Sequence, residues 1–439
     1  EKVNKTTWFS EARFGMFIHW GLYAIPAKGE WYMSQERVPD KPDYKKYFDE
    51  FNPKHCDIKA WIRLAKEAGM KYVVMTAKHH DGFCLYDSAL TEYKSTNTQS
   101  GRDFILEFVT LCREENIKIG IYYSLLDWHH ADYPKYNDKF HPMRGQEKYR
   151  KEVINWNCYL EYMHGQIREL CTNYGKIDLL WLDFAYDNMN SLKWKGEELK
   201  RMVKTLQPDI LIDNRMEGCG SNDGSIMENE PSSCCGDFAS PEQCMPLEAM
   251  KRKNGAMVPW ELCTTLNDSW GYTASDRNFK SPDFLIKKLV ECVSKSGNMI
   301  LNVGPDANGD IPGEEIVILK KIGEWMKKNG ASIYGCEEAK YPRPDWGRYT
   351  KRGNKIYAHI MEGTIGPLPL IGIPKEDITN IRLLSDGSEP YDASCSMGAK
   401  KQKNIQYINF IRNVNGTAKL PDCCDTVVEI TLKSEEKNE

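Results

Sequence analysis

The sequence predicts an α/β protein in which a (β/α)8-like TIM barrel is followed by a small antiparallel β-sandwich. In the first three quarters of the chain, short apolar runs alternate with longer helical patterns, as is typical of parallel β/α units. After about residue 336 the helical spacing disappears and only short strand-like runs remain. We therefore expect a barrel domain over residues 1–336 and a β-sandwich domain over residues 337–439.

The barrel strands are predicted from apolar runs that polar or Gly-containing segments bound on both sides. These runs cover residues 14–20, 71–80, 118–124, 177–184, 210–215 and 299–305. Helices are predicted where apolar residues recur at helical spacing, over residues 57–70, 102–116 and 281–297. The last of these opens with Ser281-Pro282, a favourable helix start.

Polar and aromatic residues recur at the carboxyl ends of the predicted strands, where a barrel builds its active site. Those residues are His19, Trp20, His79, His80, Tyr123, Ser124, Asp183 and Arg215. A doubly wound sheet would instead need a Gly-rich first turn, and the sequence contains neither GxGxxG nor a P-loop. The barrel is therefore favoured over the doubly wound sheet.

The C-terminal sandwich is predicted from five strand-like runs that follow a Pro-containing connector at residues 341–349. Gly, Pro, Asn and Asp separate these runs, as in small antiparallel domains. The runs cover residues 355–361, 367–373, 378–387, 405–411 and 426–432.

Composition excludes several classes of protein. The 439 residues are 41% hydrophobic and carry 59 Lys and Arg against 63 Asp and Glu, a formal net charge of −4. A near-neutral chain has no basic surface for nucleic acid, and the hydrophobic content is too high for disorder. No run approaches the roughly 18 apolar residues of a membrane span. We expect a large globular protein with no nucleic-acid or membrane partner.

The 15 cysteines are an odd number spread along the chain without a C-x-x-C pair. Zinc-ribbon and thioredoxin-type sites are therefore excluded, and most cysteines are expected to be small buried hydrophobes in a reducing compartment. This favours the cytoplasm. Because the chain begins at Glu1 rather than Met, a secreted protein whose signal peptide has been removed stays open.

The histidines and one aspartate are the strongest candidates for chemistry. His19 ends one strand, and His79 and His80 end another. A metal centre is the alternative, but HExxH and His-x-His are absent, so we expect neither metal nor cofactor. Asp183 ends a very apolar strand beside Trp181, and Arg215 ends the next one. An arginine there would keep the aspartate ionised, although a structural ion pair or a helix cap fits the same residues.

A second carboxylate is predicted on the polar loop of residues 235–246, where Glu242 follows a proline. The next segment, residues 258–272, carries Trp260, Glu261 and Trp270, and such aromatic density suits stacking on the apolar face of a sugar. Core packing explains part of it equally well. Two carboxylates on different barrel loops are what glycoside cleavage requires.

Together these segments resemble the retaining α-L-fucosidases of glycoside hydrolase family 29. The resemblance runs from about residue 8 to residue 335. It is carried by WFSEARFGMFIHWGLYAIPAKGEWY (8–32), YVVMTAKHHDGFCLYDS (72–88), IGIYYSLLDW (119–128), LLWLDF (179–184), GDFASPEQ (236–243), WELCTTLNDSWGY (260–272) and ILNVGPDANGDIP (300–312). One position departs from the family, because Phe184 follows the aspartate where the family often has Gly.

The resemblance implies that Asp183 is the nucleophile and that Glu242 is the acid/base. Other glutamates stay open for the second role, namely Glu217, Glu228, Glu230 and Glu261, of which Glu261 is expected to be structural. The resemblance also implies that the fucose hydroxyls are held by His19, Glu30, Trp31, His79, His80 and Tyr123. Trp181 and Arg215 would line the same subsite, and Trp260 or Trp270 would meet the C5 methyl group.

The expected substrate is a terminal α-L-fucose on an oligosaccharide or glycoconjugate. Three alternatives stay open: a glycoside hydrolase of other specificity on the same barrel, a fucose-binding protein without turnover, and a metal-dependent hydrolase. The sequence indicates neither the preferred linkage nor the oligomeric state.

Overall fold

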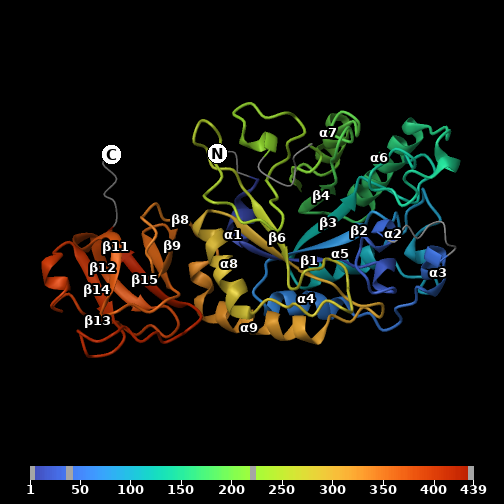
Figure 1. The fold of residues 1–439 in the computed structure, drawn as a ribbon. Helices are drawn as coiled ribbons and strands as arrows, with labels where there is room; N and C mark the ends of the chain where they lie inside the picture. Colours follow the sequence, from blue (N-terminus) through green and yellow to red (C-terminus); the bar gives the residue numbers. More distant parts are fainter. Residues whose placement is uncertain (1–4, 36–42, 218–223, 434–439) are drawn as a thin grey trace.

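The computed structural model describes residues 5–35, 43–217 and 224–433. A curved parallel sheet surrounded by helices forms the larger part, and antiparallel sheets form a smaller part beside α8 (Pro282–Ser294) and α9 (Gly313–Asn329) (Figure 1). This is the predicted combination of a TIM-like barrel and a C-terminal β domain. The boundary at residues 336 and 337 stays a prediction.

The barrel sheet has seven parallel strands in the order β5-β4-β3-β2-β1-β7-β6. Their bounds are β1 (Phe14–Ile18), β2 (Tyr72–Lys78), β3 (Lys118–Ser124), β4 (Leu179–Asp183), β5 (Leu211–Ile212), β6 (Glu261–Thr265) and β7 (Asn298–Val303). All six predicted barrel strands are present. β6 is an additional strand that the sequence did not reveal, because its residues ELCTT mix polar and apolar types without a period.

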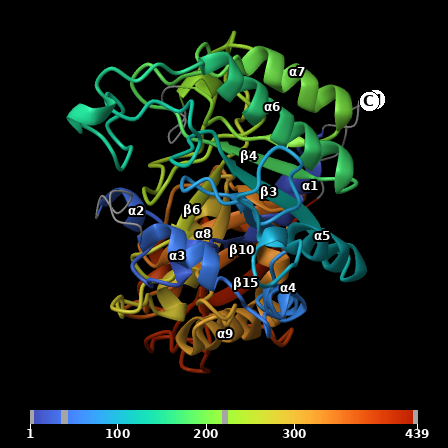
Figure 2. The same ribbon diagram turned by 90° about the vertical axis from the view of Figure 1, so that its right-hand side faces the viewer.

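Helices surround this sheet, as the turned view shows (Figure 2). The other long ones are α4 (Ile58–Glu67), α5 (Phe104–Glu114), α6 (Trp156–Asn173) and α7 (Gly196–Leu206). Shorter ones are α1 (Thr7–Ala12), α2 (Tyr32–Gln35) and α3 (Asp43–Glu50). The predicted helices 57–70, 102–116 and 281–297 correspond to α4, α5 and α8. At the start of α8, Ser281 accepts a hydrogen bond from the Phe284 amide and Pro282 occupies the first turn.

An irregular segment, residues 237–243, fills the gap between β5 and β6 and so occupies the eighth position of the barrel. The Asp237 amide donates to the Ile212 carbonyl at 2.7 Å, and Ala239 and Gln243 bond to the β6 side. The chain enters through Gly236, whose φ is +80°. A Cβ at Gly236 would lie 1.9 Å from the Asp213 carbonyl oxygen, so only glycine fits this approach. We call residues 237–243 the seam segment.

The C-terminal part consists of two antiparallel sheets, β12-β15-β10-β9-β8 and β11-β14-β13. Their strands are β8 (Glu337–Glu338), β9 (Gly347–Arg352), β10 (Lys355–Ile360), β11 (Leu368–Pro374), β12 (Ile378–Leu383), β13 (Tyr391–Asp392), β14 (Ile405–Asn409) and β15 (Thr426–Leu432). Both sheets contribute to one apolar core, for example through Ile356 and Leu370. β9 begins within the predicted connector, so the sheet starts earlier than expected.

The two parts are packed together rather than merely linked. Tyr357 and Val427 belong to the same apolar core as the barrel. The Trp325 indole of α9 donates to the Asp425 carbonyl at 3.3 Å, and Arg348 of β9 pairs with Glu291 of α8 at 2.9 Å. The C-terminal sheets therefore support the outer helices on one side of the barrel.

None of the helices placed by the structure is long and apolar enough to cross a membrane. Within the residues that the structure describes, no group of three or more His, Cys, Asp or Glu side chains is arranged to hold a metal ion.

Candidate active site

A pocket opens at the carboxyl ends of the barrel strands, and it gathers ten of the twelve residues predicted for the site. The ten are His19, Glu30, Trp31, His79, His80, Trp181, Asp183, Arg215, Glu242 and Trp270. Phe17, Tyr122, Phe184 and Cys263 complete the lining. The residues come from β1, β3, β4 and β6, from the loops after β1, β2, β4, β5 and β6, and from the seam segment.

Asp183 is the last residue of β4, and its side chain is largely buried in the pocket, with 10% of its surface exposed. Its Oδ2 accepts a hydrogen bond from the Tyr122 hydroxyl at 2.8 Å, and its Oδ1 lies 3.3 Å from Nη1 of Arg215. Burial raises the pKa of Asp183 above its ordinary value, and the Arg215 charge opposes that rise while the charge of Glu242 adds to it. Arg215 and Tyr122 thus hold this carboxyl group in a fixed orientation.

Arg215 connects both candidate carboxylates through one nitrogen. Its Nη1 also donates to Oε2 of Glu242 at 2.7 Å, and its Nε and Nη2 are held by Ser240 at 3.0 and 2.9 Å. The guanidinium lies over the Trp181 ring, 4.8 Å from its centroid. A buried, fully engaged guanidinium cannot move away from either carboxylate without losing several hydrogen bonds.

Glu261 lies behind this arrangement and does not line the pocket. It accepts hydrogen bonds from the Trp181 indole at 3.1 Å and from the Tyr72 hydroxyl. Burial raises the pKa of Glu261 to about 7. Its role is to hold Trp181 against Arg215, as expected of a structural carboxylate.

Glu242 stands on the seam segment and is more open to solvent than Asp183, with 35% of its side chain exposed. The other glutamates considered for the acid/base lie elsewhere. Glu217 is bonded to Ser191 at 3.3 Å, and the exposed Glu228 is paired with Lys253. Glu230 is exposed and outside the pocket lining. Glu242 is therefore the one of the five glutamates that faces Asp183 across the pocket.

The three histidines line the opposite wall. Nδ1 of His19 lies 2.6 Å from Oδ1 of Asn302, and Nδ1 of His80 lies 2.7 Å from the Ser124 hydroxyl. His79 stacks on Tyr122 with ring centroids 5.4 Å apart. Burial lowers the pKa of all three rings, that of His19 to about 4, so they are neutral near pH 7.

Glu30 and Trp31 enter from the loop after β1. The Gly271 amide donates to Oε2 of Glu30 at 2.8 Å, and burial raises the pKa of this carboxyl. The Trp31 ring packs 4.9 Å from His80 and 5.7 Å from Phe184, the residue that departs from the family pattern. Phe184 thus belongs to an aromatic wall beside the histidines.

Two predicted site residues, Tyr123 and Trp260, do not line the pocket. Successive side chains of a strand point to opposite faces, so Tyr122 faces the pocket while Tyr123 points outward and donates to Gln166 of α6 at 2.7 Å. Trp260 is fully buried, and its indole donates to the Lys295 carbonyl at 3.0 Å. Trp270 alone remains as the predicted apolar ring.

The sequence reasoning missed Phe17, Tyr122 and Cys263. Phe17 precedes His19 by two positions on β1, so the period of two could have placed it on the same face. Tyr122 stands in the same relation to Ser124. Cys263 lies on the unpredicted strand β6 and gave no signal.

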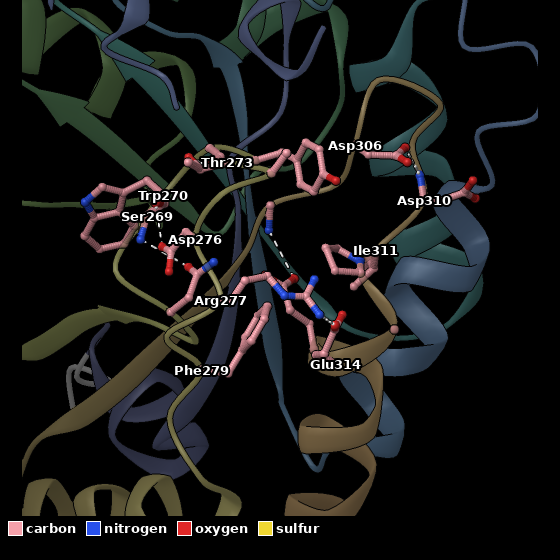
Figure 3. Close-up of a pocket in the computed structure, with 18 residues that line it drawn as sticks. Ser269, Trp270, Thr273, Asp276, Arg277, Phe279, Asp306, Asp310, Ile311 and Glu314 are labelled. Atoms are coloured by element: carbon pink, nitrogen blue, oxygen red, sulfur yellow. Dashed lines mark hydrogen bonds and ion pairs between the residues drawn. The ribbon is translucent and has the colours of Figure 1, made fainter. Parts of the chain in front are cut away.

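A second, larger cavity of about 300 Å³ lies beside the loop that carries Trp270. It is bordered by Asp276, Asp306 and Asp310, and the ion pair of Arg277 and Glu314 forms part of its lining (Figure 3). Trp270 is the only residue that borders both cavities among those the structure describes. The loop is therefore a thin wall with space on both sides.

Comparison with known proteins shows which family this chain resembles in sequence and fold. The family model described as "Alpha-L-fucosidase" matches residues 1–331. The structure of alpha-L-fucosidase isoenzyme 1 from Paenibacillus thiaminolyticus is 51% identical, with a TM-score of 0.93 over 98% of this chain and 99% of that one. Human tissue alpha-L-fucosidase is 28% identical over 386 residues, which cover 80% of this chain and 74% of the human protein.

A further similar structure is a GH29 alpha-L-fucosidase from Bacteroides thetaiotaomicron. It is 28% identical, with a TM-score of 0.81 over 99% of this chain and 97% of that one. That structure is of a covalent intermediate trapped with 2-fluoro-fucosyl fluoride in a mutant whose glutamate is replaced by glutamine.

Proposed function

The chain belongs to the alpha-L-fucosidase family of glycoside hydrolases, and on that premise we propose how its own residues release a terminal α-L-fucose with retention of configuration. Asp183 is the nucleophile and Glu242 the acid/base. The substrate is a fucosylated oligosaccharide or glycoconjugate, and the reaction requires no cofactor.

One observation carries the assignment of this pair: both carboxylates contact the same nitrogen of Arg215. Since Oδ1 of Asp183 and Oε2 of Glu242 lie 3.3 and 2.7 Å from Nη1, these two oxygens are at most about 6 Å apart. Retaining glycosidases place their carboxyl groups roughly 5–5.5 Å apart, whereas inverting ones need roughly 6.5–9.5 Å to admit a water between them. The separation supports direct attack by Asp183.

In the first step, ionised Asp183 attacks the anomeric carbon and forms an ester with it. The glycosidic bond breaks, and protonated Glu242 gives its proton to the departing oxygen. In the second step, Glu242 takes a proton from water, whose oxygen attacks the anomeric carbon and releases Asp183. Two inversions at the same carbon restore its configuration.

Arg215 serves the two carboxylates in turn. Before the first step Asp183 carries the negative charge and Glu242 is neutral. Once the ester has formed, Asp183 is neutral and Glu242 carries the charge, 2.7 Å from the same guanidinium nitrogen. A single cation therefore stabilises the reactive anion of each step without moving.

The remaining lining fits a neutral, methylated sugar. His19, His79, His80 and Glu30 offer hydrogen-bonding groups to hydroxyls, and the Trp270 ring offers an apolar surface to the C5 methyl group. The Glu242 side lies open, so the leaving group departs in that direction.

Trapping with 2-fluoro-fucosyl fluoride tests the proposal directly. We expect the Glu242→Gln protein to gain the mass of one 2-fluoro-fucosyl group, and peptide mapping to locate it on Asp183. The Glu230→Gln protein is the matched control and should carry the label on the same residue but lose it faster, because its acid/base can still activate water. A label on any other residue would remove Asp183 from its role.

A panel of nitrophenyl glycosides tests the choice of sugar. The fucoside should be cleaved far faster than the α- and β-galactosides, and chelator should have no effect. Faster cleavage of a galactoside would favour a glycoside hydrolase of other specificity. Fucose binding without turnover of any glycoside would favour a fucose-binding protein that has no catalytic activity.

A further inference from the structure

We propose that Asn302 and Ser124 are positioning residues that fix which ring nitrogen of His19 and His80 carries the proton. Both histidines then present a bare Nε2 to the pocket, whereas His79 presents an Nε2–H. The proposal rests on the fucosidase function and adds a rule for sugar recognition. Sugar hydroxyls must donate hydrogen bonds to His19 and to His80, and a sugar hydroxyl must accept one from His79.

The hydrogen bonds of Asn302 fix the orientation of its side-chain amide. Its Nδ2 lies 2.7 Å from the backbone carbonyl oxygen of Trp270, and a carbonyl oxygen can only accept. The amide nitrogen must therefore face Trp270, which leaves the amide oxygen facing Nδ1 of His19 at 2.6 Å. That oxygen carries no hydrogen, so Nδ1 of His19 has to donate.

Ser124 constrains His80 in the same way, because its hydroxyl has a single hydrogen. The Leu126 carbonyl oxygen lies 2.8 Å from this hydroxyl and can only accept it. The serine oxygen is then left to accept from Nδ1 of His80 at 2.7 Å. Nδ1 of His80 is therefore protonated as well.

Both histidine rings are neutral near pH 7. Burial lowers the pKa of His19 to about 4 and that of His80 well below its ordinary value, so each ring holds one proton near pH 7. Since that proton is on Nδ1, Nε2 is an acceptor in both rings. Neither Nε2 has a hydrogen-bond partner among the described residues, and both histidines line the pocket.

His79 has the opposite pattern. Its Nδ1 is buried and meets no hydrogen-bond partner among the residues that the structure places. A buried N–H without an acceptor is rarer in proteins than an unused acceptor. The proton of this neutral ring therefore belongs on Nε2, where a substrate oxygen can accept it.

The pattern has a consequence for the substrate. The His79 and His80 ring centroids are 4.0 Å apart, so one hydroxyl can accept from His79 and donate to His80. A fluorine in its place still accepts weakly but cannot donate. Fluorination should therefore weaken binding at hydroxyls that face His19 or His80 more than at one that faces His79 alone.

Two-bond ¹H–¹⁵N correlation spectra of enzyme labelled with ¹⁵N-histidine test the inference without substrate. Free neutral histidine prefers the Nε2–H form, so an Nδ1–H form reports on the protein. We expect Nδ1–H signals for His19 and His80 and an Nε2–H signal for His79, assigned from His→Gln variants. An Nε2–H form of His19 or His80 in the unmodified enzyme would overturn the proposal.

Ser124→Ala is the matched variant, because it removes the hydroxyl oxygen that accepts the hydrogen bond from Nδ1 of His80. We expect the His80 signal to change to the Nε2–H form while His19 stays unchanged, with kcat/KM for nitrophenyl fucoside reduced about tenfold, the size of one lost hydrogen bond. Ser124→Thr should restore both. An unchanged His80 tautomer in folded Ser124→Ala protein would show that Ser124 does not fix it.

These outcomes are separate from those of the fucosidase proposal. An enzyme that cleaves fucosides but shows the wrong tautomers refutes only the present inference. An inactive protein that shows the expected tautomers refutes only the proposed function.

Discussion

The two candidate catalytic carboxylates stand on very different parts of the barrel. Asp183 ends a regular strand that pairs with β3 on one side and β5 on the other, and it is almost fully buried. Glu242 stands on the irregular seam segment between β5 and β6, and about a third of its side chain is exposed. The proposed nucleophile is held by a regular strand, whereas the proposed acid/base, which would meet varied leaving groups and water, stands in the open.

Asp183→Ala should have the largest effect, because no other group near the anomeric carbon can form the ester. We expect kcat for nitrophenyl fucoside to fall by about 10⁴–10⁶-fold, the range seen when a catalytic triad loses one member. Steady-state kinetics measure this, with circular dichroism as the check on folding. If a folded Asp183→Ala protein kept a kcat within tenfold of that of the unmodified enzyme, the buried carboxylate would be dispensable and the contrast with Glu242 would fail.

Glu242→Gln should have a smaller and more selective effect. Acid assistance matters most for poor leaving groups, so we expect about a 10²–10³-fold loss of kcat/KM on a fucosyl disaccharide and much less on nitrophenyl fucoside. Glu217→Gln, which lies outside the pocket, is the control and should change neither. Equal losses on both substrates would argue that Glu242 acts structurally.

Arg215→Lys should move the acid limb of the pH profile of kcat/KM. Protonation of Asp183 removes the nucleophile, so activity is lost as the pH falls through the pKa of this group, which burial has already raised. Lysine cannot reproduce the shared guanidinium contacts, so the carboxylate becomes less stabilised and its pKa rises further. We expect the limb to shift upward by about one pH unit. A downward shift would contradict the role given to Arg215.

The smallest predicted effects are those of removing the hydroxyl groups of Tyr122 and Tyr123, and they should differ between these two neighbouring residues. Tyr122→Phe removes the hydrogen bond to Asp183 and should lower kcat/KM about tenfold. Tyr123→Phe removes only the bond to Gln166 and should leave kcat/KM within about twofold while costing about 1 kcal/mol of unfolding free energy. If Tyr123→Phe damaged catalysis more than Tyr122→Phe, the faces assigned to β3 would be wrong.

The sequence predicted the region around Asp183 better than the region around Glu242, for a physical reason. A buried strand has a period and an end, so the sequence alone marks the position of Asp183 and of His19. The seam segment has no period, and its place between β5 and β6 depends on contacts with Ile212 and Pro259 that no local pattern reveals. The sequence marked Glu242 only as a carboxylate on a polar loop, and its role as acid/base came from the family resemblance.

The errors have the same origin. Tyr123 was placed in the site because the sequence does not show which face of β3 is inward, and Trp260 because core and sugar-facing tryptophans look alike in a sequence. The sequence does not reveal that Asn302 and Ser124 form hydrogen bonds with His19 and His80, because each bond joins residues far apart in the chain.

The seam also has an evolutionary consequence. Five backbone hydrogen bonds tie residues 237–243 to Ile212 and to residues 259–263, and they end at Gln243, so insertions and substitutions beyond Gln243 can accumulate without dismantling the sheet. The strands that bear Asp183 and the histidine wall lack that freedom. Descendants of such a chain can diversify in the glycans they accept while inheriting one unchanged way of holding the sugar that they remove.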